Sequence, residues 1–158
     1  MGILILPLTL IVGWVLAILN LTPPGATDGE DFAVSALRWL FTIPAGYMFV
    51  ASGIMHTVFA KSTAKNIGWQ TNGFQYELGF VSLGFVSLGI GAAGIVAAYY
   101  DFSAWLVLTI VVSCFLLGAA ANHIKEMISE RNYSPGNTWV LIYDIGLPAS
   151  LIVLLCLS

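Results

Sequence analysis

Residues 102–124 read FSAWLVLTIVVSCFLLGAAANHI and contain no Asp, Glu, Lys or Arg, although Asp101 precedes them and Lys125 follows them. A helix that crosses a bilayer needs about 20 consecutive, mostly apolar residues, and this stretch is long enough. It also lacks the strict alternation of apolar and polar residues that marks the strands of a membrane barrel. The stretch therefore predicts a membrane-spanning helix.

Four further apolar stretches have similar length, and together they predict an all-α integral membrane bundle of about five transmembrane helices. The first stretch has no positive charge at its start and is long for a secretory signal, so we interpret it as a span. Short, turn-rich connections leave no room for a soluble domain, and residues 1–158 are expected to form a single transmembrane domain. The expected spans are residues 2–21, 37–60, 76–99, 102–124 and 138–157.

The composition supports a membrane location. Hydrophobic residues make up 59% of the chain and charged residues only 8%, whereas about a quarter of the residues in a soluble domain are charged. A lipid bilayer is therefore the expected partner. The net charge of -3 and the lack of a basic patch argue against nucleic-acid binding.

The positive charges indicate an orientation. Lys61 and Lys65 follow the second expected span, Lys125 and Arg131 follow the fourth, and only Arg38 lies on the other side. Because cytoplasmic loops carry the excess of Lys and Arg, the N-terminus is expected in the cytoplasm and the C-terminus outside the cell membrane.

The third expected span carries a stripe of small residues at alternating steps of three and four. Small side chains let helix backbones approach closely within a membrane. The stripe predicts either a central helix of the bundle or a homo-oligomer contact, and its members are Gly84, Ser87, Gly91, Gly94 and Ala98.

Four ionisable residues lie within or at the ends of different expected spans, in the same half of the bundle. They are His56, Glu77, His123 and Asp144. Such groups cost about 2.5–3.5 kcal/mol each at the centre of a membrane helix, so their grouping suggests a functional polar site. Further polar or interfacial residues that we assign to this substrate or proton pathway are Gln75, Asn122, Asn137, Tyr143 and Trp69.

Two chemical interpretations of this site remain open. Imidazole and carboxylate groups are suitable ligands for a divalent metal, and a haem held between His56 and His123 is a further variant. The same groups also carry protons, since histidine titrates near neutral pH. Pro148 cannot donate a hydrogen bond to the carbonyl of Asp144, which leaves an acceptor beside this carboxylate.

Part of the chain resembles a known family. The segments His56-Thr-Val-Phe59, Ala64-Lys-Asn-Ile-Gly-Trp69 and Phe74-Gln-Tyr-Glu77-Leu-Gly79, with the later His123, Pro135-Gly-Asn137, Asp144 and Pro148, resemble a prokaryotic family of small multi-pass membrane proteins of unknown function. The resemblance runs from the second expected span to the end and does not include the first. It implies a membrane location and no particular reaction.

Three functions are therefore compatible with the sequence. The first is transport of a cation, a proton or a small solute through the His/Glu/Asp site. The second is a membrane-embedded enzyme, with or without a metal, that acts on a lipid or a quinone. The third is a structural or accessory membrane subunit in which the polar residues only bond helices together.

Overall fold

The structure is a computed structural model that describes residues 4–68 and 82–158. Every regular element within these two ranges is a helix. In chain order they are α1 (Ile5–Ile18), α2 (Phe32–Thr42), η2 (Ile43–Tyr47), α3 (Met48–Thr57), α4 (Ala60–Ile67), α5 (Leu83–Ala97), α6 (Phe102–Ser129), α7 (Pro135–Thr138) and α8 (Val140–Leu157).

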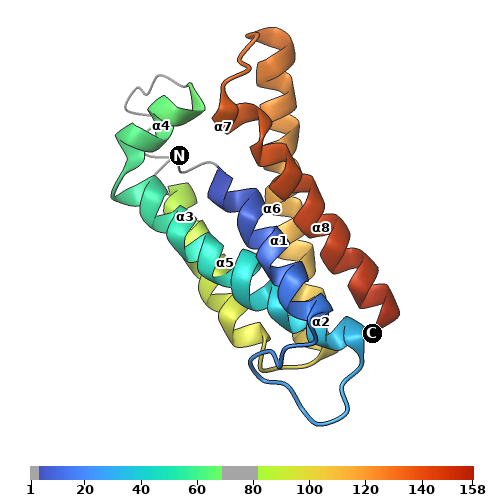
Figure 1. The fold of residues 1–158 in the computed structure, drawn as a ribbon. Coiled ribbons are helices and arrows are strands. Elements are labelled where there is room, and N and C mark those ends of the chain that lie inside the picture. Colours follow the sequence, from blue (N-terminus) through green and yellow to red (C-terminus); the bar gives the residue numbers. More distant parts are fainter. Residues whose placement is uncertain (1–3, 69–81) are drawn as a thin grey trace.

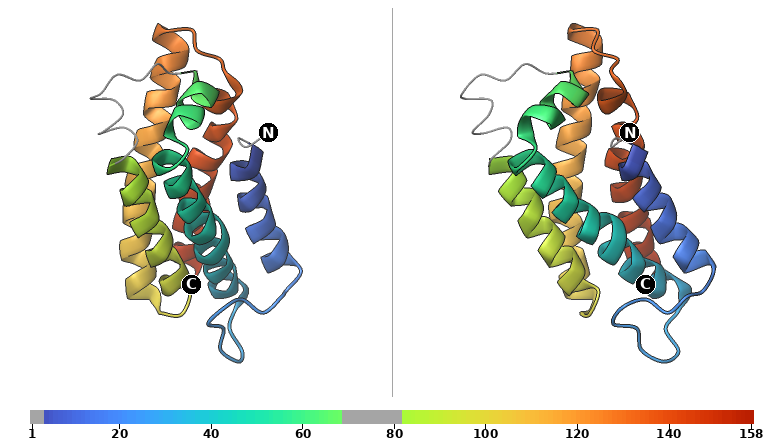
Figure 2. Two further views of the ribbon diagram at one scale, coloured as in Figure 1. Left: turned by 90° about the vertical axis from the view of Figure 1, so that its left-hand side faces the viewer. Right: turned by 60° about the vertical axis from the view of Figure 1, so that its left-hand side comes forward.

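The long helices run in alternating directions and form a bundle (Figures 1 and 2). One end of the bundle carries α4, α7 and the N-terminal end of α1, and the opposite end carries the C-terminus and the loop between α1 and α2 (Figure 1). The position of a residue along its helix therefore determines at which end of the bundle the residue lies. The C-terminal part of α6 and the N-terminal part of α8 lie at the α4–α7 end.

The rod formed by α2, η2 and α3 is continuous from Phe32 to Thr57. Asp31 begins it, because its side chain accepts a hydrogen bond of 2.9 Å from the backbone N–H of Val34. In the middle, Ile43–Tyr47 forms a wide π-turn that contains Pro44. A proline lacks an N–H and crowds the preceding turn of an α-helix, so a locally wider turn accommodates it.

The small-residue stripe of α5 packs against this rod within the same chain. A Cβ atom at Gly91 would lie 2.6 Å from the backbone nitrogen of Val50, and one at Gly94 would lie 2.8 Å from the carbonyl of Ala45. Gly84 similarly faces Gly53 in α3. The absent side chains allow α5 to approach η2 and α3 at backbone distance.

Three helices of the described residues are long and apolar enough to cross a membrane. They are Phe32–Thr57, Phe102–Ser129 and Pro135–Leu157. The first helix begins before the expected span 37–60 and also ends before that span does. The second continues beyond the end of the expected span 102–124, and the third begins before the expected span 138–157. The remaining apolar helices, α1 and α5, have only 14 and 15 residues within the described ranges.

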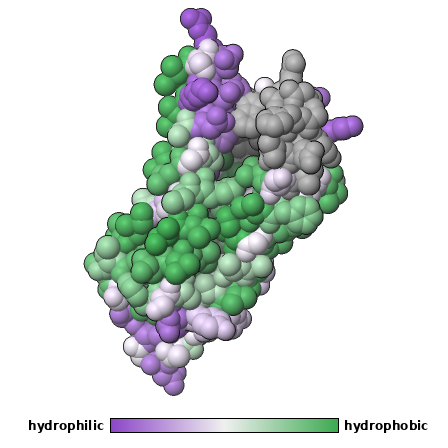
Figure 3. All heavy atoms as spheres, turned by 180° about the vertical axis from the view of Figure 1, so that it is seen from behind, coloured by the Kyte–Doolittle hydropathy of each residue, from purple (hydrophilic) through white to green (hydrophobic). Residues whose placement is uncertain are grey.

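The outer surface between the two ends is apolar. Figure 3 shows hydrophobic residues across the middle of one face and hydrophilic residues gathered at both ends. Large apolar side chains stay exposed on every long helix, among them Ile18, Phe85, Val107 and Val153. The interior, in contrast, holds Asn137 and Asp144. The interior is otherwise mostly apolar, so apolar side chains cover both the core and the middle of the surface, which suits a lipid surrounding.

Candidate polar site at the junction of three helices

The site is built where α6, α7 and α8 meet. His123 lies on the buried face of α6. After α6 the chain turns, and α7 places the fully buried Asn137 opposite that histidine. Asp144 follows in the second turn of α8 and is 3% exposed. The sequence separates these residues, and the sharp turn between the two long helices brings them together.

Both the NH₂ group and the oxygen of the Asn137 side-chain amide form hydrogen bonds in this junction. Its Nδ2 donates to the carbonyl of Asn132 at 2.8 Å and to the carbonyl of His123 at 3.1 Å. Its Oδ1 lies 2.5 Å from Nδ1 of His123. The side chain therefore ties the turn after α6 to the last part of α6 itself, and it holds the imidazole ring in one orientation.

The other ring nitrogen of His123 faces Asp144. Nε2 lies 3.9 Å from Oδ2 of Asp144, which is an ion-pair distance but too long for a direct hydrogen bond. Oδ2 is buried and has no hydrogen-bond partner within the described part of the chain. A buried, unsatisfied carboxylate oxygen is costly, and such groups in native proteins call for a ligand, a water or a functional reason.

The structure places the other expected site residues differently. Tyr143 is buried, but its hydroxyl donates to the carbonyl of Pro44 and so faces η2. His56 is half-buried on α3, where its Nδ1 lies 2.8 Å from the carbonyl of Ser52. Asn122 is exposed although it adjoins His123. Gln75, Glu77 and Trp69 lie outside the described residues.

The described side chains do not complete a metal centre. No three His, Cys, Asp or Glu side chains are grouped closely enough for this within residues 4–68 and 82–158. His123 and Asp144 would supply two ligands, and structural or catalytic zinc sites take three or four from the protein.

Three hydroxyl groups inside the bundle also lack a hydrogen-bond partner among the described residues. They belong to Ser87 of α5 and to Thr109 and Ser113 of α6. Hydroxyls in membrane helices commonly donate to the carbonyl one turn back, as Thr42 does to Arg38 at 2.8 Å. The interior thus contains polar atoms beyond the His123–Asp144 junction.

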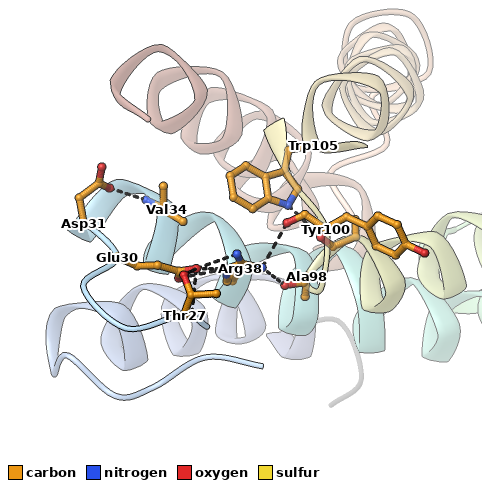
Figure 4. A network of polar contacts seen from close by, with 9 residues as sticks. Thr27, Glu30, Asp31, Val34, Arg38, Ala98, Tyr100 and Trp105 are labelled. Carbon is orange, nitrogen blue, oxygen red and sulfur yellow. Dashed lines mark hydrogen bonds and ion pairs between the residues drawn. The ribbon is translucent and has the colours of Figure 1, made fainter. Parts of the chain in front are cut away.

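A second polar network lies at the opposite end of the bundle (Figure 4). The buried Arg38 contacts both carboxylate oxygens of Glu30, with Nη2 at 2.7 Å from Oε1. Its Nη1 donates to the carbonyls of Ala98 and Tyr100. The guanidinium also lies over the ring of Trp105, 5.1 Å from the centroid. These contacts join the α1–α2 loop, α2, the end of α5 and the start of α6.

In the sequence, Arg38 stands out only as the one cation on its expected side of the membrane. The signal that could have revealed its role is an arginine within an apolar helix, eight residues after a glutamate in an otherwise turn-rich loop. Burial raises the pKa of the Glu30 carboxyl, but hydrogen bonds from Arg38 and Thr27 outweigh this effect and hold its pKa below the ordinary value of 4.5.

The fold and the site together define a helical protein with membrane-length apolar helices and a polar junction buried among three of them. The chain belongs to a family of unknown function, DUF6790, which it matches over residues 3–158. The match includes the first expected span, which the resemblance noted above did not cover. No curated protein and no solved structure matches the chain.

Proposed function

We propose that this protein is a five-span protein of the cell membrane that transports a cation or a proton through the junction of α6, α7 and α8. The observation that carries the proposal is the buried Oδ2 of Asp144, which faces Nε2 of His123 at 3.9 Å and has no hydrogen-bond partner within the described residues. A carboxylate kept in this state on an apolar helix is expected to serve a positively charged species.

The chemistry of the site favours a cation over an anion or an apolar solute. Asp144 contributes a negative charge, and no lysine or arginine is paired with it in the described part of the chain. The imidazole of His123, whose nitrogens can bind or release a proton, lies across from this carboxylate and could take part in proton transfer. The carbonyl of Asp144, which Pro148 cannot bond, adds a further oxygen acceptor at the same depth.

The distribution of charge supports a cytoplasmic location for this site. Lys61 and Lys65 lie on α4, Lys125 lies in the last part of α6 and Arg131 in the turn after it, all at the end of the bundle that carries α4 and α7 (Figure 1). Because positive residues accumulate on the cytoplasmic side, that end and the N-terminus are assigned to the cytoplasm. The C-terminus is then outside.

Flux measurements on purified protein in proteoliposomes test the proposal. Protons are followed with an entrapped pH-sensitive dye, and Na⁺, K⁺ and Mn²⁺ are followed as tracers. We expect flux of one of these ions through the wild-type protein and its loss in Asp144→Asn. Glu130→Gln, which removes an exposed carboxylate at the same end of the bundle, is the matched control and should retain the flux.

The second candidate function is that of a structural or accessory membrane subunit. It is favoured by the Asn137 amide, all of whose hydrogen bonds join α7 to α6 and to the turn after α6. The flux experiment separates the two functions. Wild-type protein that moves none of the four ions, or flux that is unchanged in Asp144→Asn, would overturn transport through this site and leave the accessory role.

A further inference from the structure

The short helix α4 has one buried side and one exposed side. Its buried side is formed by Ala60, Thr63 and Ala64. Its exposed side carries two lysines, Lys61 and Lys65. Residues four apart in a helix are neighbours on one face, so the two positive charges lie together. Neither lysine is paired with a carboxylate within residues 4–68 and 82–158.

Two contacts hold α4 against the bundle with this side outward. The hydroxyl of Thr63 donates to the carbonyl of Met55 in α3 at 2.8 Å. At its other end, Gly68 ends the helix in the left-handed conformation, and a Cβ atom there would lie 3.0 Å from Oδ1 of Asn132. The helix is thus held between α3 and the turn after α6, and its two lysines remain on the free side.

The rod formed by α2, η2 and α3 places α4 at the membrane surface. The rod has 26 residues, which span about 39 Å at a rise of 1.5 Å per residue. The hydrocarbon core of a bilayer is about 30 Å thick, and the headgroup regions extend this to about 40–45 Å. A rod centred in the bilayer therefore ends among the headgroups, and α4 begins just after it, at Ala60.

Large apolar side chains lie directly beside the two lysines. Val58 and Phe59 connect α3 to α4, and they are 71% and 52% exposed. At a bilayer surface, such side chains enter the boundary of the acyl chains while lysines reach the phosphate groups. A free phosphate ion would use only the lysines. The combination of charge and apolar surface therefore favours a lipid.

We infer that the exposed side of α4, formed by Lys61 and Lys65 with the adjoining Val58 and Phe59, is a binding site for anionic phospholipids of the cytoplasmic leaflet. The inference rests on the membrane location and orientation given in the proposed function, and it adds a ligand at a place separate from the Asp144 junction. The cytoplasmic leaflet carries anionic headgroups, and each lysine close to them strengthens the attraction about fivefold.

Native mass spectrometry of the protein in mild detergent tests the site, with dioleoylphosphatidylglycerol and dioleoylphosphatidylcholine as the two probes. We expect the wild-type protein to bind phosphatidylglycerol more tightly than phosphatidylcholine. The double substitution Lys61→Gln and Lys65→Gln should lower the affinity for phosphatidylglycerol about 25-fold, whereas Lys61→Arg and Lys65→Arg should retain it. Equal affinity of the wild-type protein for the two lipids would overturn the inference.

A matched control distinguishes α4 from the general positive charge at this end of the bundle. Lys125→Gln with Arg131→Gln removes two exposed charges on other elements, and it should change the affinity for phosphatidylglycerol much less. Equal losses in the two double glutamine variants would contradict a site on α4, because the lipid would then respond only to net charge.

Inorganic phosphate is the third probe, and it distinguishes a lipid from a free anion. Phosphate at the same concentration as the lipid should not displace phosphatidylglycerol, and Phe59→Ser should weaken lipid binding because it removes apolar contact. Displacement by phosphate, or full lipid affinity in Phe59→Ser, would replace the lipid site with a simple anion site and so overturn the inference.

The lipid result and the flux result fail separately. A preference for phosphatidylglycerol that depends on α4, in a protein that moves no ion, would retain the lipid site and remove transport. Ion flux that depends on Asp144, combined with equal affinity for the two lipids, would retain transport and remove the lipid site. The comparison of the two lipids on the wild-type protein decides the question even where a variant does not fold.

Discussion

The hydroxyl of Tyr143 donates a hydrogen bond of 2.5 Å to the carbonyl of Pro44, a residue 99 positions away in the sequence. This bond connects α8 to the π-turn of the rod formed by α2, η2 and α3. It also explains why Tyr143 and Asp144 have different surroundings although they are neighbours, because successive residues of a helix point about 100° apart. Tyr143 faces the π-turn, and Asp144 faces His123 of α6.

Tyr143→Phe should therefore destabilise the protein without changing its fold. The ring is retained, but the buried carbonyl of Pro44 loses its donor from α8, at a cost of about 1–3 kcal/mol. Thermal unfolding in mild detergent measures the effect. Tyr133→Phe removes an exposed hydroxyl and is the matched control, which should change stability little. Equal effects of the two substitutions would show that the bond to Pro44 contributes nothing.

Arg38→Met should be more damaging, since it removes the ion-pair partner of Glu30, which keeps only its bonds from Thr27, and the donor of two backbone carbonyls. Removal of one partner of a buried ion pair costs about 3–5 kcal/mol. We expect a lower free energy of unfolding in detergent and faster proteolysis of the loop between α1 and α2. Lys125→Met, at an exposed position of α6, is the control and should have neither effect.

The Arg38–Glu30 pair should also give the stability a dependence on pH. The pKa of Glu30 is lower in the folded protein than its ordinary value of 4.5, so its ionised form is stabilised by folding. This contribution is complete above pH 4.5 and is lost as the pH falls below 4.5 and through the lowered pKa. The difference in unfolding free energy between wild type and Glu30→Gln should be largest at neutral pH and shrink on acidification; a constant difference would contradict it.

Gly91→Ala tests the close contact of α5 with the rod. Its new Cβ would lie 2.6 Å from the backbone nitrogen of Val50, and backbone atoms cannot move aside as a flexible side chain does. Overpacking of this kind costs about 1–3 kcal/mol. Gly89→Ala, two residues earlier on the same helix, meets no atom within 4 Å and should be neutral or slightly stabilising. Thermal unfolding of both variants checks the prediction.

Asp144→Leu should stabilise the protein while it abolishes ion flux. The substitution removes a buried carboxylate whose Oδ2 has no hydrogen-bond partner in the described ranges, and such an unsatisfied group costs about 1–3 kcal/mol or more. Asn122→Leu, at an exposed position of α6, is the control and should alter the unfolding free energy by no more than about 0.5 kcal/mol. A less stable Asp144→Leu protein would instead make this carboxylate a structural group.

The apolar runs predicted the helices because length and composition are sufficient for that purpose. They did not predict the π-turn at Pro44 in the rod formed by α2, η2 and α3, since a proline in an apolar run indicates a kink or a break and not its geometry. The candidate site was predicted only from the positions of its residues along the expected spans, which give their depth in the bundle. Depth placed His123, Asn137 and Asp144 at one end, but facing depends on tertiary packing, and only the structure shows that Asn122 points outward and that Tyr143 bonds to η2.

The π-turn has a consequence for the architecture of the whole bundle. A turn with one extra residue advances everything after it by one helical step, about 100° around the axis. The half of the rod before the turn packs mainly on α1 and α8, with fewer contacts to α5, and the half after it packs mainly on α5. One continuous helix thus contributes to two interfaces, and the turn sets the angle between them. Deletion of a single residue within Ile43–Tyr47 would remove this extra step and rotate α3 away from the glycines of α5 that it packs against.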